Sequence, residues 1–166
     1  MELDALDIDL LRELRTRPRV GVLELARTLR VARATVQARL DRMERAGVVT
    51  GYGPDVDLRA AGFPVQALVT LEIAQGALEV VTDELLATPA VLEAYATTGA
   101  ADVWCRIGAA SHEDLQQTLL HLTRSPTVSR STSVVVLSEV VAPRVLPLLE
   151  RDRPHAPRRA PAYRPT

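Results

Sequence analysis

The sequence contains no lysine and no asparagine, and it has one cysteine, one tryptophan and one phenylalanine. The lone Cys105 cannot form an internal disulfide, and with three scattered histidines it cannot supply the four ligands of an ordinary structural zinc site. No run of eighteen apolar residues occurs, and the first twenty residues alternate charge with leucine. We therefore expect no metal site, no membrane partner, no secretory signal and a reducing, cytoplasmic setting.

Arginine supplies all twenty basic side chains, and it is unevenly distributed along the chain. Ten arginines accompany eight acidic residues in residues 1–50, five accompany twelve in residues 51–150, and five accompany one in residues 151–166. Positive charge is thus confined to the two ends, which predicts a polyanion partner for the N-terminal part. The planar guanidinium suits phosphate because it can donate to two oxygens at once.

Residues 1–53 show the spacing of three short helices, and the composition, 47% hydrophobic and 25% charged, is sufficient to bury a core. Either Asp4 or Asp7 can cap the first helix, and Pro18 follows its end. A tight bend is expected before the last helix, and Gly47 suits that helix's C-terminus. The predicted helices cover residues 6–14, 22–29 and 33–47.

After a linker at residues 54–63 the pattern changes to strands and helices. The strands are predicted at residues 65–74, 91–98, 101–109 and 131–141, and the helices at residues 78–86 and 111–122. This order predicts an α+β chain with a ferredoxin-like βαββαβ domain over residues 64–150. Because the strands are apolar on both sides, we expect the sheet face opposite the helices to need a partner.

The last sixteen residues, 151–166, contain four prolines and five arginines and almost no apolar side chains. Such a composition cannot bury enough apolar surface to offset the entropy of ordering. We expect a disordered basic tail.

Residues 22–49 place a short helix, a tight turn and a longer helix in the order that delivers the second helix into a DNA major groove. Because Val36, Leu40 and Met43 face the core, the other side of this helix faces outward. Arg33 and Gln37 lie one turn apart at its exposed start, where arginine can pair with guanine and glutamine with adenine. A charged outer face is also typical of any amphipathic helix, and this is the plainer alternative.

The candidate DNA-binding residues all lie on this third helix. Thr35 can contact a thymine methyl group or a phosphate. The arginines farther along are better suited to phosphates, which fix register without reading sequence. The candidate set is Arg33, Ala34, Thr35, Gln37, Ala38, Arg39 and Arg42.

Three stretches of the chain resemble the Lrp/AsnC family of feast/famine transcription regulators. The opening LDALDIDLLREL resembles the family's first helix, VARATVQARLDRMERAGVVTGY its recognition helix and the turn after it, and the remainder to residue 150 its effector-binding and oligomerisation domain. Two positions depart from the family pattern: Arg30 replaces a turn glycine and Ala32 replaces a capping serine. We therefore expect a less firmly capped start of the recognition helix.

The resemblance implies a sequence-specific DNA-binding regulator, not an enzyme, that responds to an amino acid or a similar small metabolite. It implies double-stranded DNA as partner, a homodimer or higher oligomer, a nucleoid-associated location in the cytoplasm, and no cofactor apart from the effector. An aspartate can hold an α-ammonium group, and hydroxyls with turn N–H groups can hold a carboxylate. The positions that match the family's effector site are Gly99, Asp102, Ser131 and Ser133.

Other interpretations of the same residues stay open. Asp102 can instead cap the hairpin, and the two serines can lie on an outer strand face without a ligand. An enzyme resembling the sirohaem decarboxylases has the same architecture, but it needs polar or basic residues, notably histidine, along the open sheet face. His112 and His121 are predicted on a helix instead, which argues against it. A metabolite-binding module without specific DNA binding is a further alternative.

Overall fold

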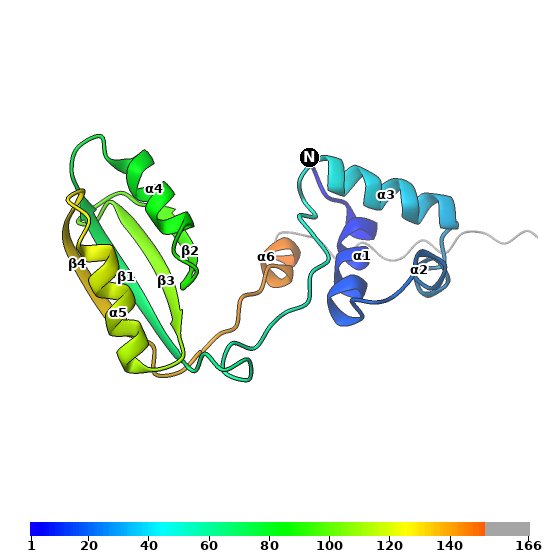
Figure 1. Ribbon diagram of the computed structural model, residues 1–166. Coiled ribbons are helices and arrows are strands. Elements are labelled where there is room, and N and C mark those ends of the chain that lie inside the picture. Colours follow the sequence, from blue (N-terminus) through cyan, green and yellow to red (C-terminus); the bar gives the residue numbers. More distant parts are fainter. Residues whose placement is uncertain (152–166) are drawn as a thin grey trace, which may run out of the picture. The chain divides into compact units, whose positions relative to one another are not determined.

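The computed structural model describes residues 1–151, and its chain divides into two compact units (Figure 1). Among the described residues, the helical unit comprises Met1–Pro54 and residues 142–151, and the sheet unit comprises Asp55–Val141. The predicted disordered tail, residues 151–166, lies outside the described residues apart from its first residue. None of the helices among the described residues is both long and apolar enough to cross a membrane.

The helical unit is built from three helices around one core. They are α1 (Ala5–Thr16), α2 (Val22–Leu29) and α3 (Arg33–Arg45). Apolar residues recur every three or four positions, so each helix buries one side and leaves the other to solvent. The buried members of this core are Leu10, Leu25, Ala26, Val36, Leu40 and Met43. The predicted helix-turn-helix fold is confirmed.

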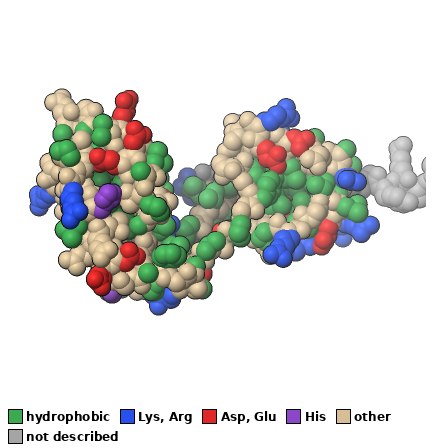
Figure 2. All heavy atoms as spheres, in the orientation of Figure 1, with side chains coloured by type: hydrophobic (Ala, Val, Ile, Leu, Met, Phe, Trp, Pro, Cys, Tyr) green, Lys and Arg blue, Asp and Glu red, His purple; other side chains and the backbone are tan. Residues whose placement is uncertain are grey.

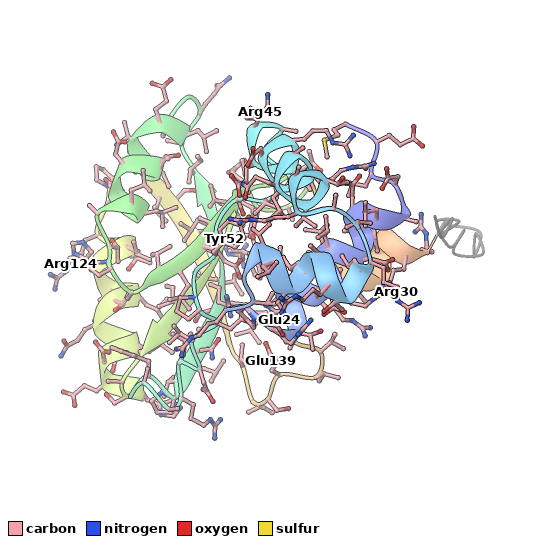
Figure 3. All side chains as sticks on the ribbon, turned by 90° about the vertical axis from the view of Figure 1, so that its right-hand side faces the viewer. Glu24, Arg30, Arg45, Tyr52, Arg124 and Glu139 are labelled. Carbon is pink, nitrogen blue, oxygen red and sulfur yellow. The ribbon has the colours of Figure 1, made fainter. Side chains whose placement is uncertain are left out.

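The turn between α2 and α3 lacks the usual capping chemistry. Arg30 ends α2 in the left-handed region, at φ 55°, which costs a residue with a side chain more than it costs glycine. Ala32 precedes α3 and gives no side-chain acceptor to the free N–H groups of its first turn. Figure 3 labels Arg30 beside the end of α2. Contacts from elsewhere in the unit must therefore help to hold α3 in place.

The sheet unit is an antiparallel sheet in the strand order β2-β3-β1-β4, with α4 and α5 packed on one face (Figure 1). Its strands are β1 (Val65–Ile73), β2 (Val91–Ala96), β3 (Val103–Ala109) and β4 (Val128–Val135), and its helices are α4 (Leu78–Leu86) and α5 (His112–Thr123). Alternate residues of β1 and β3 face the helices, and Val69 and Cys105, both fully buried, are direct cross-strand partners. The β-α-β-β-α-β order confirms the predicted ferredoxin-like fold.

The last strand differs from the prediction of residues 131–141, because β4 begins at Val128 and ends at Val135. Its antiparallel partner β1 starts at Val65, and the N–H of Val136 makes the next bond, to the Gln66 carbonyl at 2.8 Å. Beyond that bond β1 offers almost no backbone to pair with. The apolar residues that follow therefore do not continue the strand, because a ladder needs a neighbour's N–H and C=O groups as well as apolar side chains.

The sheet face opposite the helices is less apolar than the sequence predicts. Arg106 of β3 pairs with Glu93 of β2 at 2.7 Å on this face. Trp104 packs beside Tyr95, with ring centroids 5.8 Å apart. Val134 of β4 also lies on this face and is 60% exposed. The open face is therefore a mixed surface of ion pairs, aromatic rings and one exposed valine.

A short C-terminal helix, α6 (Leu146–Glu150), packs against α1 within the helical unit. Arg12 of α1 donates from Nη2 to Oε1 of Glu150 at 2.6 Å. The sequence places residues up to 150 in the ferredoxin-like domain, whereas the structure groups those from Ala142 with the helices. The physical reason is that the chain leaves the sheet after Val136 and is free to return to α1.

Candidate functional site

The start of α3 exposes the residues predicted to read DNA bases. Val36 is fully buried and fixes which side of the helix faces outward. No described residue partners Arg33, whereas Gln37 donates from Nε2 to Oδ1 of Asp41 at 2.7 Å. The outward residues form what we call the reading surface: Arg33, Ala34, Gln37 and Ala38, which are exposed, and Thr35, which is half-buried.

Arg39 and Arg42 are engaged inside the chain. Arg39 donates from Nη1 to Oδ1 of Asp7 at 3.1 Å and also contacts Asp4, and Arg42 donates from Nη2 to Oδ2 of Asp7 at 2.6 Å. The Asp7 side chain is 0% exposed, while those of Arg39 and Arg42 keep 27% and 43% of their surface accessible. The two arginines therefore join α3 to the start of α1, and their predicted phosphate contacts stay a prediction.

The same two aspartates cap α1. Oδ1 of Asp4 accepts the N–H of Asp7 at 3.1 Å, and Oδ2 of Asp7 accepts the N–H of Asp4 at 2.9 Å, which completes a capping box. Burial alone would raise the pKa of Asp4, but hydrogen bonds from Arg39 and from the Asp7 N–H outweigh burial and hold that pKa below its ordinary value. The sequence predicts Asp4 or Asp7 as the cap, but it does not predict that Arg39 and Arg42, 32 and 35 positions away, pair with Asp7.

The far end of α3 carries a second group of polar contacts. The Tyr52 hydroxyl donates to Oε1 of Glu44 at 2.6 Å, and burial together with this carboxylate raises the pKa of Tyr52 to about 12. Arg45 donates from Nε to the Asp41 carbonyl at 3.1 Å, and its side chain points away from the unit (Figure 3). Basic side chains also border the helical unit on the face seen in Figure 2. Such a distribution of cations suits a phosphate backbone.

The hairpin between β2 and β3 holds two of the predicted effector residues. Gly99 has φ 119°, a backbone conformation that residues with a side chain rarely adopt. Oδ2 of Asp102 accepts the N–H of Ile73 at 2.8 Å, and the Asp102 N–H donates to the Leu71 carbonyl at 3.0 Å. These two hydrogen bonds of Asp102 join the hairpin to the end of β1.

Ser131 and Ser133 lie on β4, directly opposite Leu71 and Val69 of β1. Leu71 therefore pairs with Ser131 of β4 along one edge of β1, and along the other edge its carbonyl accepts the N–H of Asp102. Ser131 is half-buried and Ser133 is exposed. The structure brings Ser131 and the hairpin to the same end of the sheet and leaves Ser133 farther along the strand.

Two cavities lie elsewhere in the sheet unit. One of about 520 Å³ has apolar walls that include Leu58 and Phe63 and polar walls that include Asp114 and His121 of α5. The other, of about 330 Å³, lies between α4 and β2. Neither of these two cavities is lined by a predicted effector residue.

Two family models match the chain. The model described as winged helix-turn-helix DNA-binding matches residues 3–50, over the three helices. The model described as Lrp/AsnC ligand binding domain matches residues 66–146, over the sheet unit and the segment after it.

Several known proteins are similar along most of the chain. The HTH-type transcriptional regulator Rv2324 of Mycobacterium tuberculosis is 31% identical over 143 residues, which cover 84% of this chain and 95% of that protein. The solved structure of Escherichia coli AsnC has a TM-score of 0.82 at 24% identity and covers 89% of this chain and 100% of that one. The solved L-Met complex of the regulator NMB0573 from Neisseria meningitidis has a TM-score of 0.78 at 24% identity and covers 85% and 94%.

Proposed function

The chain belongs to the Lrp/AsnC family of transcription regulators, and from this premise we propose how it reads DNA and what it senses. Its family binds DNA through the helix-turn-helix and responds to amino acids, so the chain is a DNA-binding regulator and not an enzyme. The relatives are named transcription regulators, and none supports the alternative of a sirohaem-decarboxylase-like enzyme.

We propose that the reading surface of α3 recognises sequence in a major groove. The observation that carries this proposal is the unpartnered Arg33 one turn before Gln37 on an accessible helix face. Arg33 can donate to O6 and N7 of guanine, and Gln37 can pair with adenine once it leaves Asp41. Ala34, Thr35 and Ala38 are short enough to let the helix approach the bases and to contact a thymine methyl group. Arg39 and Arg42 keep enough exposed surface to contact a phosphate as well.

The proposed effector is an amino acid or a similar metabolite, bound by Gly99, Asp102 and Ser131 at one end of the sheet and by Ser133 two residues farther along β4. An ammonium group suits the Asp102 carboxylate, and a carboxylate suits the serine hydroxyls and the N–H groups of the turn. The complex of the Neisseria relative with L-Met supports this ligand class. A second copy of the chain is proposed to complete the site.

A homodimer, or a higher oligomer, is the proposed assembly. The described chain exposes an apolar stretch from β4 onward, in which Leu137 and Val140 are 90% and 91% exposed. An exposed apolar segment of this kind marks an interaction site. Two-fold symmetry would place two α3 helices in successive major grooves of a roughly palindromic site. The proposed location is the cytoplasm, on the nucleoid.

A gel-shift titration of the full chain against the DNA upstream of its own gene tests the function. We expect a discrete complex that resists competition by random duplex, and a shift in its affinity when the matching amino acid is added. Equal competition by specific and random DNA would contradict sequence-specific binding. An affinity that none of the twenty amino acids alters would contradict an amino-acid effector.

A further inference from the structure

Asp7 is a fully buried carboxylate at the start of α1, 0% exposed among the described residues. A buried carboxylate is unfavourable unless it is paired and hydrogen-bonded. Both of its oxygens are satisfied: Oδ1 by Arg39, and Oδ2 by Arg42 and by the Asp4 N–H. Both arginines belong to the helix that carries the reading surface. We call the set of Asp7, Arg39 and Arg42 the Asp7 clamp.

The clamp acts on a helix that has weak support at its own start. Ala32 gives α3 no side-chain cap, and the turn before it contains Arg30 in a left-handed conformation. The reading surface occupies the first two turns of α3, and the clamp holds the turns that follow. The angle at which Arg33 and Gln37 are presented therefore depends on contacts made farther along the helix.

The clamp also limits how α3 attracts phosphate. Asp7 and Asp4 offset the positive charge of Arg39 and Arg42 within a few ångströms, since the Asp7 pairs measure 3.1 and 2.6 Å. Attraction to phosphate is independent of sequence, and each phosphate contact adds about 0.9 to the salt dependence of binding. Without the aspartates, both guanidinium groups would be free to bind any duplex.

We propose that Asp7 is a positioning residue for DNA recognition: it orients α3 so that Arg33 and Gln37 meet base edges, and it withholds Arg39 and Arg42 from indiscriminate phosphate binding. The inference rests on the proposed role of the reading surface and adds the residue that directs it. If Asp7 served only to stabilise the fold, its replacement would weaken binding to specific and random duplexes alike. The clamp instead requires opposite changes for specific and random DNA.

The test compares the full wild-type chain with Asp7→Asn on two duplexes, one enriched by the wild type from a random pool and one of random sequence and equal length. Asp7→Asn removes the charge and keeps the side-chain size. Discrimination between the duplexes should fall about tenfold, while affinity for the random duplex at low salt rises and the salt slope steepens by about one to two.

A second variant, Asp4→Asn, keeps the result decisive if Asp7→Asn does not fold. Asparagine caps a helix as well as aspartate does, so α1 is preserved while Arg39 loses one carboxylate. Asp4→Asn should lower the discrimination between the duplexes and steepen the salt slope by about half as much as Asp7→Asn does. The matched control is Asp9→Asn, the same change on the same helix, because the Arg12 partner of Asp9 lies on α1 and not on α3. The control should behave as wild type.

Equal losses of affinity for both duplexes at an unchanged salt slope would overturn the inference. So would an Asp9→Asn effect as large as that of Asp7→Asn, because net charge alone would then explain the result. A wild type that enriches no sequence would overturn the reading surface itself and the inference with it. A wild type that does enrich a sequence, with Asp4 and Asp7 variants of unchanged discrimination, would overturn the Asp7 role alone.

Discussion

Arg33 and Gln37 lie on one face of α3, but their side chains differ in whether they already have a hydrogen-bond partner. No described residue partners Arg33, whereas Gln37 must leave Asp41 before its amide can reach a base. Arg33→Ala and Gln37→Ala should each relax preference at one base position, by about 1 to 3 kcal/mol, with the smaller effect for Gln37. Binding to a panel of duplexes that differ at single positions measures this.

The matched control is Arg27→Ala, which removes an exposed arginine from α2. It should leave the order of preference among the duplexes unchanged. If the Arg33 and Gln37 variants also keep the wild-type order, the reading surface is misassigned.

Asp102 combines a structural bond with a proposed ligand contact, and one substitution separates them. In Asp102→Asn the amide oxygen can still accept the Ile73 N–H, so the fold should persist. The charge-assisted contact to an ammonium group would be lost, which should weaken effector binding about ten- to a hundredfold. A thermal-shift screen of the twenty amino acids, followed by titration of any hit, measures the change.

Glu79→Gln is the control for Asp102, because it removes an exposed charge from α4 of the same unit. Equal effector affinity in wild type and Asp102→Asn would exclude Asp102 from the site. Unfolding of Asp102→Asn alone would show that its bond to β1 is the dominant role.

At the scale of whole elements, α3 should gain stability from the cap that it lacks. Ala32→Ser provides an oxygen to the free N–H groups of the first turn and should raise the free energy of unfolding by about 0.5 to 2 kcal/mol. Ala38→Ser, the same change at an exposed position inside the helix, should instead lower it slightly, because serine is a poorer helix former than alanine. Chemical denaturation of both variants against wild type gives the comparison, and an identical response would show that the start of α3 needs no cap.

The contact of Asp4, at the start of α1, with Arg39 of α3 should weaken in acid. The folded chain holds the pKa of Asp4 below its ordinary 3.8, so the stability that its carboxylate contributes is fully present above that value. It is lost as the pH falls through the lowered pKa. Thermal unfolding followed from pH 5 to pH 2 should therefore show a decrease that is smaller in Asp4→Asn. The same decrease in both proteins would assign the acid sensitivity to other carboxylates.

Most elements follow from local sequence patterns, and the exceptions depend on partners. The helices at Val22–Leu29 and Leu78–Leu86 agree with the predicted ranges because their apolar spacing and flanking residues are local signals. The predicted strand at residues 131–141 is wrong at both ends because β1, not the valine run, determines how far β4 can pair. The Asp7 clamp was missed for a related reason: a sequence shows that Asp7 can cap α1, but not which distant arginines meet it.

For the whole molecule, the proposed dimer should form through the open sheet face and the apolar segment that follows β4. The full chain should scatter light as at least a dimer at micromolar concentration. Val134→Glu places a charge on the open face and should favour the monomer, because burying an unpaired carboxylate is unfavourable. Leu120→Glu is the control, because this exposed residue lies on α5, which packs on the opposite face of the sheet. A wild type that is a clean monomer would contradict the proposed assembly.

The return of the chain to α1 through α6 makes the helical unit discontinuous in sequence. A ribosome releases residues 1–54 long before residues 146–150, so this unit is complete only after residues 146–150 have been released. The arrangement also decides where a label can be attached. A fluorescent protein fused after residue 166 is tethered to the DNA-binding unit, although it follows the sensor domain in the sequence. A reporter of effector binding therefore belongs inside the sheet unit, for example in the turn at residues 74–77, between β1 and α4.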